Sequence, residues 1–167
     1  METKAWHQGS LLDLSGCYWR SCTLHAAVKL DVFTVIGDGK LAVEKIADRL
    51  NADQRAVERL LNALVAMGLL EKSGDGFANT PASRSLLSKE SMEYIGHIIL
   101  HHHHLAESWV NLDQSVRSGK PVRKRMSYSE PQWRESFLMG MFNLAMKVAP
   151  LVAKAIDLSG HHRFLDV

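Results

Sequence analysis

Histidines are the side chains in this sequence whose spacing is most suggestive of chemistry. Four follow one another at 101–104, inside the chain rather than at an end. On a helix that turns about 100° per residue, His97, His101 and His104 share one face, with Glu107 at its edge. Imidazoles at positions i and i+4 can reach one metal ion. Because the sequence has no HExxH motif and no second ligand cluster, a metal site is disfavoured. A solvated helix surface and a polar pocket wall both stay open for this tract.

A carboxylate near the end of the sequence suggests a second kind of chemistry. RFLDV, residues 163–167, has the apolar run of a short buried strand with Asp166 near its tip. In doubly wound sheets such a strand leads into a glycine-rich loop and a helix N-terminus, where a cofactor binds. Residues 161–167 are therefore expected to be the first strand of a domain that this sequence does not contain.

Other reactive or charged residues are assigned no site. Cys17 and Cys22 are five positions apart, which fits neither a CxxC redox pair nor half of a zinc knuckle. The cluster Arg117, Lys120 and 123–125 could contact phosphates. A solvated turn is favoured instead, because no aromatic residues interleave to stack on bases.

Composition excludes few classes of protein. The hydrophobic fraction is 46% and the formal net charge is +2, so neither a nucleic-acid nor a membrane partner is required. We expect no membrane association, since no apolar run approaches the ~18 residues of a membrane span. Two cysteines without a signal peptide predict a reduced, cytoplasmic protein.

The elements that would position these residues are mostly helices. Apolar residues at intervals of three and four predict a helix over 10–36, and further helices over 41–51 and 53–68, with Asp53 as cap. Residues 69–80 predict two strands around the turn 73–76, and Thr80-Pro81 then starts another helix. Three helices followed by a hairpin indicate a winged helix-turn-helix over 1–90.

A winged helix often binds DNA, but the charges here do not favour it. Residues 31–90 carry eight basic and nine acidic side chains, a net charge of −1. Contact with phosphates needs a dense positive surface. The hairpin is therefore interpreted as a packing device, and no nucleic-acid partner is expected.

The chain continues beyond a minimal regulator. Residues 91–119 and 130–160 are helical by period, so 91–160 is interpreted as a helical region that borders a substrate pocket. The fold class is thus mainly α: a winged-helix domain plus a helical linker region, ending in a first strand.

The order of these segments resembles the small-molecule S-adenosylmethionine-dependent O-methyltransferases, including plant caffeate, hydroxyindole and bacterial polyketide-tailoring enzymes. Residues 30–87 resemble the family's N-terminal winged-helix dimerisation domain. LAESWVNLDQSVRSGKP (105–121) resembles its ESW segment, FLMGM (137–141) the stretch before the cofactor domain, and RFLDV the start of cofactor motif I.

The resemblance implies a function for the whole enzyme and a limit for this chain. It implies a homodimer that transfers a methyl group from S-adenosylmethionine to a small aromatic or polyketide-like hydroxyl. Asp166 would help to organise the cofactor loop. The glycine loop, the ribose-binding acid and the general-base histidine lie beyond Val167 in the family, so no catalytic residue is expected here. The chain alone should be inactive and should not bind the cofactor. A stand-alone winged-helix regulator or ligand sensor is the alternative.

The resemblance also assigns the wall of the acceptor pocket. Carried across by position, the wall residues are Leu100 and Leu105 from one helix and Trp133, Phe137, Met141 and Leu144 from another. The last four form one helical stripe, although a stripe of this kind is also typical of plain core. Plant relatives have a histidine where Leu144 stands, so a hydrogen bond to the acceptor is either lost here or supplied by His101 or His104.

The first predicted helix has more apolar surface than a monomer can bury. Its apolar residues surround much of its circumference: Leu11, Leu12, Leu14, Tyr18, Trp19, Leu24, Val28 and Leu30. We therefore expect an intimate homodimer through residues 5–36 and the winged-helix helices, with packing against 130–157 as the alternative.

Overall fold

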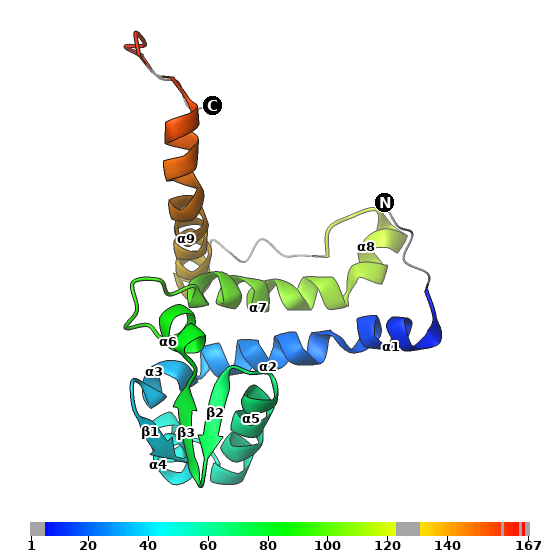
Figure 1. The fold of residues 1–167 in the computed structure, drawn as a ribbon. Coiled ribbons are helices and arrows are strands. Elements are labelled where there is room, and N and C mark those ends of the chain that lie inside the picture. The colour runs from blue at the N-terminus through cyan, green and yellow to red at the C-terminus, as the bar shows by residue number, and fades with distance from the viewer. Residues whose placement is uncertain (1–5, 123–130, 158, 164, 166–167) are drawn as a thin grey trace.

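The structure is a computed structural model that describes residues 6–122, 131–157, 159–163 and 165. It is mostly helical, with one small three-stranded sheet (Figure 1). In chain order the elements are α1 (Gln8–Gly16), α2 (Tyr18–Lys29), α3 (Val32–Ile36), β1 (Lys40–Ala42), α4 (Val43–Leu50), α5 (Gln54–Ala66), β2 (Leu70–Ser73), β3 (Gly76–Asn79), α6 (Pro81–Leu87), α7 (Gly96–Val110), α8 (Leu112–Ser118) and α9 (Pro131–Ala155).

The helix ends predicted from local signals are confirmed. The Asp53 carboxylate accepts a hydrogen bond from the Ala56 backbone N–H at 2.8 Å, and so caps α5. Gly68 follows α5 with φ of +72°, a left-handed conformation that glycine adopts without steric cost. The Thr80 hydroxyl accepts from the Ser83 N–H at the start of α6.

The prediction of one helix over 10–36 is wrong, because three helices occupy this segment. The first break falls at Cys17, which ends α1 and precedes α2. The second falls at Asp31, whose φ of 65° is left-handed. The Thr34 hydroxyl donates to the Asp31 carboxylate at 2.7 Å, a local bond that competes with helix continuation. Apolar periodicity runs through both breaks and so could not reveal them.

The sheet contains a strand that the sequence pattern missed. Its order is β1-β3-β2, with β3 antiparallel to both neighbours. The hairpin β2–β3 is where it was predicted. Strand β1, whose Leu41 pairs with Phe77, covers positions expected to begin the helix at 41. A three-residue strand has no periodicity of its own, so pairing with β3 decides its conformation.

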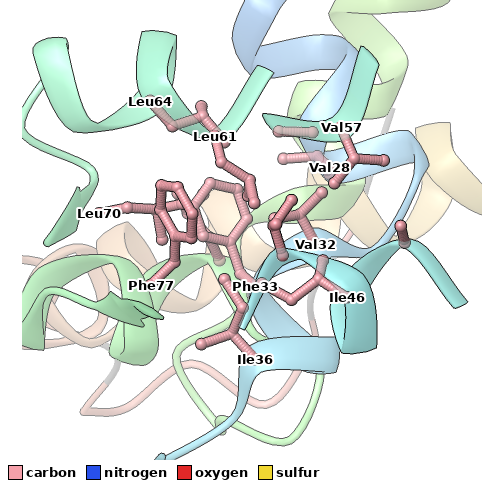
Figure 2. Packing of buried hydrophobic residues seen from close by; sticks show 14 of the residues in the cluster. Val28, Val32, Phe33, Ile36, Ile46, Val57, Leu61, Leu64, Leu70 and Phe77 are labelled. Atoms are coloured by element: carbon pink, nitrogen blue, oxygen red, sulfur yellow. The ribbon is translucent and has the colours of Figure 1, made fainter. Parts of the chain in front are cut away.

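The hydrophobic core lies between this sheet and the helices α2 to α5. Figure 2 shows Phe33 and Phe77 pointing into the same interior. Phe33 is fully buried and Phe77 is 1% exposed. Val28, Ile46 and Leu61 close the core from α2, α4 and α5. Ala27 and Val28 of α2 belong to this core, and α2 in turn packs against α7.

Helix α7 lies between the core and the last long helix. It packs against α2 on one side and against α9 on another. The helix predicted over 91–119 is divided at Asn111 into α7 and α8, and it begins at Gly96. Figure 1 shows α9 crossing one end of α7 and extending away from the rest of the molecule. Pro150 lies within α9, which continues to Ala155.

The expected strand at 161–167 does not form in the residues that the structure describes there, 161–163 and 165. A strand is stabilised by hydrogen bonds to a neighbour, and the sheet of this chain lies at the opposite end of the molecule (Figure 1). Phe164, Asp166 and Val167 lie outside the described residues.

By length and composition alone, α9 could cross a membrane, with a mean hydropathy of 1.5 over its most apolar window. The expectation that no segment approaches this length is corrected for α9. The helix remains apolar on average although it contains isolated charged residues. Of its most apolar segment, 11% is buried inside the chain.

Asn79 joins the end of α3 to the sheet. Its side-chain amide donates to the backbone carbonyls of Phe33, at 2.8 Å, and of Gly37, at 2.9 Å. The Phe33 carbonyl also accepts from the Gly37 backbone N–H at 3.1 Å, and Gly37 directly follows the last residue of α3. This one side chain therefore bonds two backbone carbonyls beside the core.

We expect Asn79→Asp to destabilise the chain by about 2–4 kcal/mol, because a carboxylate can donate to neither carbonyl. Urea denaturation at pH 7 measures the change. The matched control is Asn62→Asp: Asn62 accepts from the Lys72 ammonium at 3.0 Å, and a carboxylate can accept equally well. The control should change stability by less than about 0.5 kcal/mol. Equal effects of the two substitutions would contradict the role given to Asn79.

Candidate functional site

The candidate site is built on the helix pair α7 and α9. The two helices approach closely at Gly140, which is buried on α9. A Cβ added there would lie 3.0 Å from the Ile98 Cα atom, so a larger residue would push the helices apart. Ser136, one turn earlier, is 5% exposed and its hydroxyl donates to the Gln132 carbonyl. Small residues at the crossing thus hold the neighbouring aromatic side chains at the α7 surface.

Two histidines of α7 contact two aromatic residues of α9. The His104 and Trp133 rings are stacked, with centroids 4.6 Å apart and an angle of 7° between planes. The His101 and Phe137 rings lie 5.2 Å apart and are tilted by 55°. The structure therefore brings two histidines of the tract against two aromatic residues of the predicted stripe. We call these four residues, together with the other two residues of the stripe, the α7–α9 wall: His101, His104, Trp133, Phe137, Met141 and Leu144.

Most of the predicted stripe is accessible. Phe137 is 40% exposed, Met141 37% and Leu144 48%, so these three are not core of this chain. Trp133 is half-buried, because one face of its indole is covered by His104. The stripe is thus a surface with one end anchored by stacking.

The remaining predicted site residues are not brought to this wall by any described contact. Leu105 is half-buried on α7. Leu100 packs against the hydrophobic core around Phe33, on the side of α7 that faces α2. Asp166, predicted to lie beside the cofactor, is outside the described residues.

His104 in the wall and His97 nearby on α7 are held towards their neutral form. Burial lowers the pKa of His104, and His103, His101 and Lys29 lower it further by repelling a second positive charge. Burial also lowers the pKa of His97, against which the Glu135 carboxylate acts in the opposite direction. A neutral imidazole has one donor and one acceptor nitrogen. The wall therefore offers hydrogen-bonding capacity without a full charge.

Within the part of the chain that the structure describes, no group of three or more His, Cys, Asp or Glu side chains could hold a metal ion. The spacing of His97, His101 and His104 therefore does not assemble a metal site there. Instead, the three rings pack against Tyr94, Phe137 and Trp133, respectively. Of the two interpretations left open for the histidines, the polar wall fits these contacts.

The sequence analysis did not identify the residues that support the wall from beneath, on the buried face of α9. The Asn143 Oδ1 atom and the His104 Nδ1 atom are buried and have no hydrogen-bond partner among the described residues. Ser136, Gly140 and Asn143 recur at intervals of four and three, one helical face apart from the predicted stripe. That second, small-residue period was the available signal for the α7 contact.

A second surface lies on the first two helices. Helix α1 has no buried residue, and its Leu11, Leu12 and Leu14 are 51%, 64% and 57% exposed. Tyr18 and Trp19 at the start of α2 are 57% and 66% exposed. We call these five residues the α1–α2 apolar surface. Exposed apolar surface of this extent marks an interaction site in soluble proteins.

The chain is similar to known proteins over regions that include both surfaces. Residues 12–89 match the family model of the O-methyltransferase dimerisation domain. The chain is 29% identical over 95% of its length to the N,N-dimethyltransferase OxyT of Streptomyces rimosus, covering 49% of that protein. It is 30% identical over 94% of its length to the 3-hydroxy-5-methyl-1-naphthoate 3-O-methyltransferase of Streptomyces sahachiroi, covering 47% of that protein.

A solved structure shows the same fold. Human N-acetylserotonin methyltransferase, in complex with S-adenosylmethionine, superposes with a TM-score of 0.76 at 23% identity, over 94% of this chain and 51% of that one. The chain spans about half the length of the curated relatives it matches. The match over residues 12–89 and the similarity to small-molecule methyltransferases agree: over residues 12–89 the chain is similar to the dimerisation domain of the O-methyltransferase family.

Proposed function

We propose that this chain is the N-terminal, dimer-forming and substrate-capping part of an S-adenosylmethionine-dependent methyltransferase. Its acceptor would be a hydroxyl group on a small aromatic or polyketide-like molecule. In this proposal the protein is cytoplasmic, and neither DNA nor a membrane is its partner. The oxygen acceptor follows the Streptomyces sahachiroi relative. The Streptomyces rimosus relative is named as an N,N-dimethyltransferase, so aromatic amines belong in the same substrate screen.

The observation that carries this proposal is the extent of the similarity. The two Streptomyces relatives align with 94–95% of the chain, whereas the dimerisation domain ends at residue 89. Helices α7 and α9 therefore have counterparts in small-molecule methyltransferases. A winged-helix regulator, the alternative class, has no need of this region, and no similarity supports it.

We further propose that α3 to α6 and the sheet form a winged helix used for dimerisation. The order of helices and the β2–β3 hairpin support this proposal. Dimerisation would cover the α1–α2 apolar surface, which the chain does not bury itself. Obligate interfaces commonly bury ~2,000 Å² or more and are rich in apolar residues.

We expect the chain to be a homodimer at micromolar concentration, with twice the chain mass of 18.7 kDa by light scattering. Leu12→Glu combined with Trp19→Glu should weaken the dimer at least about 30-fold, because each substitution places a charge in an apolar contact. Met92→Glu is the control, since Met92 is fully exposed outside this surface. A monomeric mass for the unsubstituted chain would contradict the prediction.

The cofactor is proposed for the full-length protein only. Asp166, the one residue assigned to S-adenosylmethionine, lies outside the described residues. When bound to the complete enzyme, the cofactor supplies an already activated methyl group. The contribution of this chain would be to position the acceptor and to keep water away from it.

Calorimetric titration of the 167-residue chain with S-adenosylmethionine should therefore show no binding heat. The full-length protein, titrated under the same conditions, is the positive control. Micromolar affinity of the 167-residue chain would place cofactor contacts inside it and would refute the assigned boundary.

The α7–α9 wall is proposed to contact the acceptor. A flat aromatic molecule packs well against the exposed Phe137 ring and the flexible thioether of Met141. The half-exposed Leu144 continues this apolar surface, and the His101 and His104 rings lie at its other edge, with the pKa of His104 lowered by burial. Leu100 and Leu105 were assigned to the same pocket from the resemblance. The core packing of Leu100 gives it a supporting rather than a lining role in this proposal.

In the full-length enzyme, Phe137→Ala and Met141→Ala should each lower kcat/KM for the acceptor by about 10- to 100-fold. That loss corresponds to roughly 1.4–2.7 kcal/mol of transition-state stabilisation. Cofactor affinity and the melting temperature should change little. The measurements are steady-state kinetics with varied acceptor, cofactor titration and thermal unfolding.

Matched controls lie on the same helix. Phe142 and Met146 are 55% and 54% exposed and lie more than 100° around α9 from Phe137 and Met141, respectively. Their alanine variants should keep acceptor kinetics near those of the unsubstituted enzyme. If all four variants behave alike, or if the wall variants only unfold, the stripe is structural and the assignment fails.

A further inference from the structure

Histidines face one another across the contact between α2 and α7. The rings of His25, on α2, and His103, on α7, have centroids 5.7 Å apart. The Lys29 ammonium of α2 lies 3.5 Å from the His103 Nε2 atom. We call these three residues, which join the core to α7, the α2–α7 seam. Three nitrogen-bearing side chains are thus gathered where two packed helices meet.

The groups around the seam provide no compensating negative charge. His103 and His102 of α7 lower the pKa of His25, and Lys29 lowers the pKa of His103, in each case by repelling a second positive charge. Helices α3 and α5 also pack on α2, but neither contributes to the shift in the pKa of His25. On the α9 side, the Trp133 ring stacks on His104. The Glu135 carboxylate raises the pKa of His97, which lies on a different face of α7 from His103. Among the described residues, no carboxylate therefore offsets charge at His25 or His103.

We propose that the α2–α7 seam is an acid-sensitive joint. When His25 and His103 both take up protons beside Lys29, which is already charged, three cations face one another between the two helices. Their repulsion favours separation of α7 from α2. Because α9 packs against α7, separation of α7 from α2 would detach α7 and α9 together from the core. This inference concerns the joint alone and is independent of the proposed function.

Burial adds to the repulsion. The His25 Nδ1 atom is buried and has no hydrogen-bond partner among the described residues, so a proton placed there would be poorly solvated. Burial is the largest cause that lowers the pKa of both His25 and His103, and the neighbouring positive charges add to it.

The lowered pKa values set the direction of the effect. In the unfolded or separated state each histidine titrates near its ordinary pKa of about 6.5. The packed state binds fewer protons below that pH, so the stability of the seam is complete above about pH 6.5. It decreases as the pH falls from there through the folded pKa values.

The test is urea denaturation of the chain at pH 7.5 and pH 5.5. Acidification should raise the unfolding equilibrium constant, with each seam histidine contributing up to about tenfold at pH 5.5. The double variant His25→Gln and His103→Gln should lose that contribution, because glutamine does not titrate. His162→Gln, an exposed histidine beyond α9, should retain the full pH dependence of the unsubstituted chain.

A second measurement does not depend on the stability of the variant. Titration of the imidazole resonances by NMR in the unsubstituted chain should place the pKa of His25 and His103 below 6.5. Values at or above 6.5 would overturn the proposal. So would an unchanged pH dependence in a folded double variant.

Discussion

The position of α7 between two partners is the constraint on which the rest of this structure depends. One side of the helix must pack on α2 and the core, and another must accept α9 at close range. The close approach is possible because Gly140 has no side chain where α9 meets the Ile98 backbone. Ile99 and Leu100 pack on the core, while Ile98 lies next to Gly140 of α9. A helix with two packing surfaces cannot have the single apolar stripe of an ordinary surface helix.

Consecutive histidines suit this position because an imidazole is both flat and polar. His104 stacks on Trp133 as an aromatic ring would, and His101 lies against Phe137. His103 faces the other way, towards His25 and Lys29. Leucines at all four positions would place more apolar surface around the helix than its partners cover. The tract therefore serves two interfaces at once, and burial holds His103 and His104 towards the neutral form that packing requires.

The two exposed apolar regions differ in origin. On α1, no residue is buried at all, so the helix contributes little to the stability of a single copy. On α9, Ser136 and Gly140 are buried against α7, and the opposite faces remain exposed. An apolar helix attached along one narrow face is stable only if something else covers its other faces.

Local chemistry, readable in the sequence alone, determined the helix ends and the hairpin. Asp53, Gly68 and Thr80 act within three or four residues of their own position, so tertiary context was not needed to predict them. The segment order also determined the family resemblance and the mainly helical fold. The stripe Trp133, Phe137, Met141 and Leu144 followed from spacing and family position.

Tertiary structure decided what depends on partners distant in the sequence. Strand β1 exists because β3 pairs with it, and Asp31 turns the chain so that α3 can enter the core. Periodicity alone left core and pocket equally open for the stripe, and packing at Gly140 is what leaves Phe137 and Met141 exposed. The contacts of His104 with Trp133 and of His25 with His103 join residues 29 and 78 positions apart. No local pattern records such pairings, because they arise only when α2, α7 and α9 pack together.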